Sequence, residues 1–422
     1  MANTLLTPSM ITREALRVLH NNIVFAKGVN KQYSDEFARK EGKIGNTINV
    51  RKPPQYYVRD GKTMQTQAAT ETYVAVELTN QWGVDINFSS QELSTSIDDF
   101  SERFIKPAMA KLASHVDYQG LALAKDVYNQ VGTPGSTPGT NTGSGLLVAN
   151  TPGIFLNAGA VLDMFACPRD ENRNIVLNPQ AMAGSVGGLS GLFQDSGKIA
   201  EQYRNGMMGR ALGFNFAMDQ NVNTLTTGAH AGTYTDFKVD GADQTGSTLH
   251  IDGFTASTAT ITAGEVFTIA GVYSVNPENQ QSTGELARFT VVTGGTVDGS
   301  GDIDLTISPP IVVAGTGVAN GTVNAGPADG ALISFLSLAA VSTQTAETHP
   351  MNLAYHKDAF TLATADLILP EGVHFAARET YDGISMRIIR QYDINNDNMP
   401  CRIDILGGWK TLRPEFACRI AG

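Results

Sequence analysis

The stretch of chain between Asn221 and Thr345 is strongly acidic and nearly free of basic residues. It holds only two basic residues, Lys238 and Arg288, against eleven acidic ones, so its net charge is -9. Thr and Gly supply 21 and 17 of its 125 residues, a composition typical of short strands joined by tight turns. The other 297 residues carry 28 basic and 30 acidic side chains and are nearly balanced. The sequence therefore predicts a β-rich module inserted into another domain.

The composition of the whole chain fits a globular protein of two or three domains, with 422 residues, 42% hydrophobic and 17% charged. Its net charge of -11 is not that of a typical nucleic-acid binder and leaves room only for local basic patches. Cys167, Cys401 and Cys418 are too few and too widely spaced for a disulfide framework or zinc site, so we expect three reduced core residues. No signal-like segment is recognised at the N-terminus, which predicts a soluble protein made inside the cell.

The N-terminal region is predicted to be a basic, amphipathic helical arm. Pro8 suits the first turn of a helix, and Ile11, Ala15 and Val18 follow at helical spacing. Residues 1–62 carry eleven basic and five acidic side chains, a net charge of +6. Two interpretations account for this charge: a solvated helix face, or docking to an acidic partner or to DNA phosphates.

A charged hairpin follows the arm. Ile44 to Val50 alternates with period two, Pro53-Pro54 stops the strand, and strand-like sequence resumes at Tyr73–Leu78 and Val84–Phe88. So long a hairpin has too little apolar surface to pack on its own subunit, and we expect it to reach a neighbouring one. The candidate contact residues near its tip are Arg51, Lys52, Arg59, Asp60 and Lys62.

The rest of the chain mixes helices and strands. Apolar residues from Ile105 to Val127 recur at steps of three and four, which predicts a helix of about 22 residues that must lie against a sheet. A second helical stripe runs from Phe155 to Phe165 and ends before Pro168. Strands are expected at Arg173–Asn178, Ile384–Tyr392, Cys401–Leu406 and Phe416–Ile420. This pattern is α+β, interrupted by a β insertion.

Two glycine-rich or acidic motifs suggest ligand sites but fit poorly. Gly191 to Ile199 resembles a phosphate-binding loop, yet it has one residue too many between the glycines and Ile in place of Ser or Thr. Asp393, Asn395 and Asp397 have calcium-loop spacing, but Asn398 replaces the turn glycine and position twelve is Asp404 rather than Glu. Turn chemistry of Asn and Asp explains the second motif better. The sequence therefore predicts no cofactor, no metal and no enzymatic site.

The order of these parts resembles the major capsid (coat) proteins of tailed bacteriophages. The likeness is greatest to coat proteins of short-tailed phages that carry an insertion domain. The stretches that carry the resemblance are Phe104–Ala113, Gly206–Phe214, Leu353–Phe360, Ala376–Tyr392 and Gly408–Glu415.

The resemblance implies an α+β, Hong Kong 97-like phage capsid fold with an inserted all-β domain, antiparallel and barrel-like. It also implies a division of the chain into an N-terminal arm (1–45), an extended-loop hairpin (46–80), a peripheral domain with a long spine helix (81–148), a first part of the axial domain (149–220), the inserted β domain (221–345), and completion of the axial and peripheral domains with a C-terminal β-ribbon (346–422).

In function, the resemblance implies a structural protein of the virion capsid. Copies of the chain form hexamers and pentamers of an icosahedral shell that encloses double-stranded DNA without sequence specificity. Assembly of the procapsid in the host bacterial cytoplasm, without a membrane, involves a scaffolding protein and a portal protein, and the shell then expands. Some relatives crosslink a lysine of the extended loop to a neighbouring subunit, and Lys62 is the candidate here.

The alternatives are a phage decoration or fibre-type binding protein and, third, an enzyme. A decoration or fibre protein would lack the long helix and the charged hairpin. An enzyme would need a cluster of acid, base or metal-binding residues, which the sequence does not show.

Overall fold

The computed structural model describes residues 8–34, 47–54, 56, 61–64, 66, 72–87, 105–134, 153–189, 209–232, 236–315, 318, 320–336 and 346–422. The chain divides into two compact units. The first contains Met1–Lys52, Thr72–Leu121 and Phe360–Leu412, and the second contains Pro53–Glu71, Ala122–Ala359 and Arg413–Gly422. Each unit combines helices with sheet, as the sequence predicts.

The first unit is built on a six-stranded sheet. Its strands are β1 (Asn30–Ser34), β4 (Asn80–Ile86), β19 (Phe360–Ala365), β20 (Phe375–Tyr381), β21 (Ile384–Arg390) and β22 (Cys401–Thr411). The order is β1-β19-β22-β21-β20, and β4 also pairs with β22. β20 and β21 are joined by Asp382-Gly383, both with positive φ, the backbone that a two-residue hairpin turn of this sequence favours.

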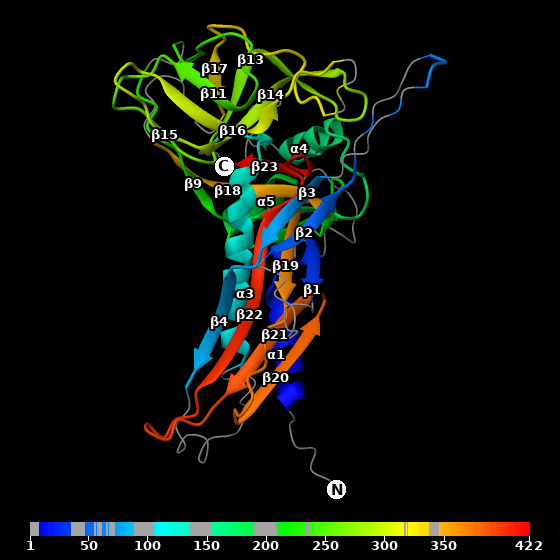
Figure 1. Cartoon of the computed structure of the whole chain (residues 1–422), viewed down its shortest axis with the longest axis vertical. Helices are drawn as coiled ribbons and strands as arrows, with labels where there is room; N and C mark the ends of the chain where they lie inside the picture. The colour runs from blue at the N-terminus through cyan, green and yellow to red at the C-terminus, as the bar shows by residue number, and fades with distance from the viewer. Residues whose placement is uncertain are drawn as a thin grey trace. The chain divides into compact units, whose positions relative to one another are not determined.

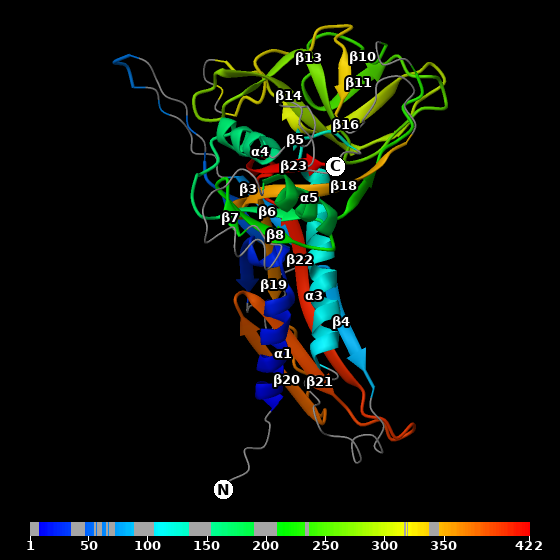
Figure 2. The same cartoon turned by 180° about the vertical axis from the view of Figure 1, so that it is seen from behind.

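Two helices cover one face of this sheet. Figure 2 shows α1 (Pro8–Asn22) and α3 (Lys106–Leu121) side by side in front of β20, β21 and β22. The stripe of Met109, Leu112 and Val116 in α3 is buried, as its spacing predicts. After α1, the 3-10 helix η1 (Phe25–Lys27) is held by Asp117 of α3, whose carboxylate accepts hydrogen bonds from backbone N–H groups on either side of Phe25.

The predicted helix of about 22 residues is shorter than expected. α3 is an α-helix of 16 residues that ends at Leu121, and the chain continues as the 3-10 helix η4 (Ala122–Asp126). A 3-10 helix has about three residues per turn, so the apolar face shifts at this point. Leu123, which the stripe includes, is half-buried, whereas its neighbour Ala124 is fully buried.

The second unit contains a seven-stranded sheet, which we call the core sheet. Its strands are β5 (Gln130–Val131), β6 (Arg173–Leu177), β7 (Arg210–Ala211), β8 (Phe214–Met218), β9 (Thr224–Thr226), β18 (Thr348–His356) and β23 (Ala417–Ala421). The order is β5-β23-β18-β6-β8-β7, with β9 also paired to β18. Its helices are α4 (Gly153–Met164), which packs on β23 and β5, α5 (Pro179–Leu189), and the 3-10 helices η5 (Lys357–Ala359) and η6 (Pro414–Phe416).

The acidic segment forms a sheet of its own within the second unit. Its strands, from Lys238 to Phe335, are β10 (Lys238–Val239), β11 (Gly246–Asp252), β13 (Val266–Val275), β14 (Ser282–Thr293), β16 (Ile303–Ile311) and β17 (Ile333–Phe335). They pair antiparallel in the order β10-β11-β16-β14-β13-β17. A further ribbon joins β12 (Thr260–Ile261) to β15 (Gly295–Thr296). We refer to residues 238–335 as the module.

The module sheet curls until its last strand meets its first (Figure 1). The N–H of Ile333 donates to the carbonyl oxygen of Phe237 over 2.9 Å, and the N–H of Val239 donates to that of Ala331 over 3.0 Å. The interior is a single hydrophobic cluster in which Phe237, Phe267, Phe289 and Phe335 are buried, the first three completely. The expected all-β, barrel-like architecture is confirmed.

Candidate subunit-contact surface

The base of the charged hairpin packs on its own unit through one face. The hairpin strands are β2 (Thr47–Lys52) and β3 (Thr72–Glu77), paired antiparallel. Val76 is fully buried in a cluster with Ala363 and Ala365, and Ile48 and Val50 pack against it. The expectation that the hairpin cannot pack on its own subunit is therefore wrong for its base, because alternation places all these apolar side chains on one face.

The opposite face of the hairpin is exposed. Arg51 lies directly across from Tyr73, and Asn49 lies across from Ala75. All four residues are exposed, and Tyr73 retains 65% of its accessible surface. A cross-strand pair of arginine and tyrosine combines a fixed positive charge with a large aromatic surface. This face can contact another chain without disturbing the buried one.

The remaining candidate residues fall on or near the hairpin tip. Lys52 follows Arg51 on β2 and is half-buried, whereas Lys62 is exposed. Tyr56 and Met64 expose 59% and 77% of their surface, large fractions for side chains of their size. Arg59 and Asp60 lie outside the described residues. Arg51 and Lys52 are thus consecutive residues of β2. Their grouping with the charged residues of the hairpin tip remains a prediction.

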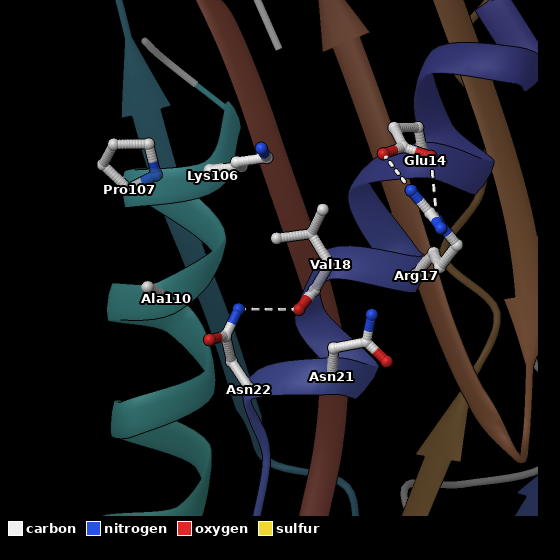
Figure 3. A pocket seen from close by; sticks show the side chains of 8 residues that line it. All are labelled: Glu14, Arg17, Val18, Asn21, Asn22, Lys106, Pro107 and Ala110. Atoms are coloured by element: carbon white, nitrogen blue, oxygen red, sulfur yellow. Dashed lines mark hydrogen bonds and ion pairs between the residues drawn. The ribbon is translucent and has the colours of Figure 1, made fainter. Parts of the chain in front are cut away.

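A pocket lined by both apolar and charged side chains lies between α1 and α3 and was not anticipated from the sequence (Figure 3). Its volume is about 460 Å³, and α3 contributes Lys106, Pro107 and Ala110. On α1, the guanidinium of Arg17 donates two hydrogen bonds, of 2.8 and 3.0 Å, to the carboxylate of Glu14. These bonds lower the pKa of Glu14 and raise that of Arg17. Since the two charges neutralise each other, Lys106 gives the pocket its net positive charge.

A charged cluster ties α1 to the turn between β20 and β21. The carboxylate of Asp382 accepts a hydrogen bond from the ammonium of Lys31 and lies 3.0 Å from Nε2 of His20. Partial burial raises the pKa of Asp382, but its hydrogen bonds with Lys31 and His20 outweigh this and lower it. Only the fold brings these residues together, because Asp382 is more than 350 positions away from either partner.

The sequence profile of a family described as "P22 coat protein - gene protein 5" matches residues 2–422. The chain belongs to the P22 coat protein family. It is a phage major capsid protein that assembles with copies of itself into the shell of the virion, and its role is structural rather than enzymatic. Membership of this family bears out the Hong Kong 97-like capsid fold expected from the resemblance, and it excludes a decoration or fibre-type protein.

Solved structures from phages are similar to this coat protein over most of its length. A chain from Mycobacterium phage Che8 has a TM-score of 0.45 and 12% identity, with 94% of this chain and 90% of that chain covered. The capsid of cyanophage P-SCSP1u gives 0.45 and 9% identity, covering 94% and 87%. The capsid of Ralstonia phage GP4 gives 0.43 and 9% identity, covering 94% and 88%. A search of curated proteins found no match.

The suspected calcium loop of the coat protein is a hydrogen-bonded turn. The carboxylate of Asp393 accepts hydrogen bonds from the backbone N–H of Asn395 over 3.0 Å and the side-chain amide of Asn396 over 2.7 Å. Asp404 lies on β22, where Arg387 and Arg402 bind its carboxylate. Across the described ranges, no group of three or more His, Cys, Asp or Glu side chains is arranged to hold a metal ion. The Gly191–Ile199 motif lies outside the described residues.

The cysteines of the coat protein are free thiols, but only two are core residues. Cys167 and Cys418 are buried, whereas Cys401, at the start of β22, is half-buried. The expectation of three core cysteines is therefore wrong for Cys401, because its strand begins at the end of the turn. Burial raises the pKa of Cys167 and Cys401 to about 11 and that of Cys418 to about 12.

Among the helices described, none has the length and hydropathy needed to cross a membrane.

The module of the coat protein presents an acidic surface on β11 and β16. His250 stands between two carboxylates, 3.1 Å from Asp240 and 2.7 Å from Asp304. The hydrogen bond with Asp304 raises the pKa of His250. Burial, followed by the nearby Asp240 and Asp302, raises the pKa of Asp252. The module therefore offers an acidic surface to other molecules.

Proposed function

We propose that this coat protein builds an icosahedral shell of hexamers and pentamers around double-stranded DNA. Assembly takes place in the host bacterial cytoplasm with a scaffolding protein and a portal protein, and the shell expands as DNA enters. Family membership over residues 2–422 supports the proposal. The net charge of +6 on residues 1–62 favours contact with phosphates without sequence specificity. The division into arm, hairpin, peripheral, axial and inserted domains is part of the same proposal.

The hairpin is proposed to dock on an acidic surface of an adjacent subunit. The observation that carries this is the two-faced hairpin: Val76 and its neighbours are buried on one side, and Arg51 and Tyr73 are exposed on the other. Lys62 adds positive charge at the tip. An exposed ion pair contributes only about 0–1 kcal/mol, which is negligible in a single dimer. In a shell the same contact recurs at every subunit, so small losses add up to failed assembly.

Charge reversal tests the hairpin contact. Arg51→Glu combined with Lys62→Glu should leave the melting temperature of the monomer nearly unchanged, because both side chains are exposed. The yield of closed particles in sedimentation should fall, and wild-type assembly should weaken as salt rises. Lys410→Glu is the control, since it reverses an exposed charge outside the hairpin. Normal particle yield from the double variant would show that the hairpin is only a solvated loop.

The requirement for a scaffolding protein is tested separately. The coat protein is expressed alone and together with the neighbouring genes of its phage, and the products are imaged in negative stain. Closed particles of uniform size are expected only in the co-expression. Uniform closed particles from the coat protein alone would contradict this part of the proposal without affecting the hairpin contact.

A further inference from the structure

Arg419, on the C-terminal strand β23, joins the module to the rest of its unit. It is only 1% exposed and is among the largest fully buried side chains of the described residues. Its guanidinium donates to the carbonyl oxygens of Val127 and Lys125 over 2.7 and 3.3 Å. It also donates to the carbonyl oxygen of Gly264 and, over 2.9 Å, to Oγ1 of Thr290. Lys125 lies in η4 and Val127 directly follows it, whereas Gly264 and Thr290 belong to the module.

The buried charge makes these four acceptors important. Burial lowers the pKa of Arg419 to about 9, while Asp126 and Cys418 act in the opposite direction. The guanidinium therefore stays protonated at neutral pH and keeps all its N–H donors. A cation removed from water is costly unless it is paired or fully hydrogen-bonded. The acceptors of Arg419 come from both sides of the junction, so β23, η4 and the module must all be in place together.

The module surface that meets Arg419 is itself fixed in position. Gly264 has a φ of +97°, a backbone conformation that favours glycine. A Cβ atom at this position would lie 3.1 Å from Cγ of Lys125, so the absence of a side chain lets the module pack closely against η4. The next residue, Glu265, is buried and accepts hydrogen bonds from the backbone N–H groups of Gly228 and Thr262 over 2.7 and 2.6 Å. The Gly264 turn is thereby tied to the chain that enters the module.

A further hydrogen bond crosses the junction beside those of Arg419. Oγ1 of Thr290 donates to the carbonyl oxygen of Lys125 over 3.1 Å while it accepts from the guanidinium. The hydroxyl thus acts as both donor and acceptor at one point of contact. Arg419, Thr290 and Lys125 form a closed set in which the loss of one member leaves the others with fewer bonds.

We propose that Arg419 is a positioning residue that latches the module to the core sheet of its own subunit and fixes the direction in which the module projects. The latch also couples folding, since β23 can bury Arg419 only against a folded module. A coat protein without the latch would fold its module but hold it in variable orientations. This inference stands apart from the hairpin contact and from the need for a scaffolding protein.

Arg173 offers a matched control. It is also buried, at 4% exposure, and its guanidinium donates to the carbonyl oxygens of Cys167 and Pro168 over 2.7 and 2.8 Å. It forms an ion pair of 2.7 Å with Asp163. All three partners lie within ten positions of Arg173 and outside the module. Arg173→Met therefore removes a buried arginine without touching the junction.

The test compares Arg419→Met with Arg173→Met in the full chain by hydrogen exchange. In Arg419→Met, amides of residues 124–131 and 262–265 should exchange at least tenfold faster, while those of β11 and β16 keep their protection. Calorimetry should show the module melting apart from the rest of its unit. Arg173→Met should lower stability without either change. Equal exchange at the junction in the two variants would overturn the proposal.

Thr290→Val keeps the test decisive if Arg419→Met fails to fold. The substitution preserves side-chain shape and removes only the hydroxyl that bonds Arg419 and Lys125. A smaller increase in exchange, confined to the same two segments, is expected. Arg419→Lys retains the charge with fewer donors and should fall between wild type and Arg419→Met. An unchanged exchange profile in Thr290→Val would count against the latch.

Discussion

A Cβ atom at Gly408 would lie 2.0 Å from the carbonyl oxygen of Glu77, so β22 and the chain at the end of β3 meet through backbone alone. No side chain fits between them. This close approach seats the buried face of the hairpin on the sheet of the first unit.

We expect Gly408→Ala to separate the hairpin base from β22. The added methyl group forces a backbone shift, and such overpacking costs about 1–3 kcal/mol in the free energy of unfolding. Urea denaturation measures the loss. Gly299→Ala is the control, because a Cβ atom at Gly299 would meet nothing within 4 Å. Equal stability of the two variants would show that the strands can separate without cost.

Asp404 is a buried acidic residue of the first unit. It is 1% exposed, and its carboxylate lies 2.7 Å from Arg387 and 2.8 Å from Arg402. Asp404→Asn leaves Arg387, whose side chain is 13% exposed, without an opposite charge, and should cost about 3–5 kcal/mol. Arg402→Met should cost less than about 1 kcal/mol, since its side chain is 55% exposed. Chemical denaturation of both variants measures the difference, and similar losses would contradict this assignment.

His349 predicts a pH dependence of stability. It is 2% exposed on β18, and burial, assisted by the charge of Arg419, lowers its pKa from 6.5 to about 4. Between these values the unfolded chain binds a proton that the folded chain does not. The free energy of unfolding should therefore fall as the pH drops from 6.5 to about 4, by up to about 3 kcal/mol.

Two substitutions isolate this contribution. His349→Leu should remove that part of the pH profile, whereas His374→Leu, at an exposed position, should leave the profile unchanged. Denaturation curves at several pH values between 4 and 7 provide the measurement. A profile of His349→Leu that parallels wild type would assign the effect to other groups.

The module is expected to fold alone. A fragment of residues 221–345 contains every strand of the module sheet and its complete hydrophobic cluster. Circular dichroism of the fragment should show a β spectrum and a cooperative thermal transition. A disordered spectrum without a transition would show that the module depends on the latch of Arg419 for its own folding.

Local patterns of the sequence predicted the elements that obey them. Met109, Leu112 and Val116 follow helical spacing and are buried, and Ile48 and Val50 alternate and share the buried face of the hairpin. The module was recognised by charge and composition, which differ from those of its flanks over more than a hundred residues. Such signals depend only on residues that are close together in the sequence, so they can be recognised without knowledge of the fold.

Features set by tertiary contacts were not predictable. The end of α3 at Leu121 was missed because the apolar stripe continues into η4. α5 was missed because Gly and Ser weaken its local helical signal. Arg419 and Thr290 are 129 positions apart, and no local pattern marks a buried arginine whose acceptors are mostly carbonyl oxygens. Of the hairpin residues, the sequence located Arg51 and Lys52 but not the face on which each lies.

The chain enters and leaves the module at adjacent points. Thr226 and Thr348 lie opposite each other in the β9–β18 pair, and their hydroxyl oxygens are 2.9 Å apart. A domain that replaces the 121 residues between them therefore needs neighbouring termini, and it must also supply acceptors for Arg419 in place of Gly264 and Thr290. For particle engineering, a foreign domain inserted between Thr226 and Thr348 would be displayed once by every subunit of the shell.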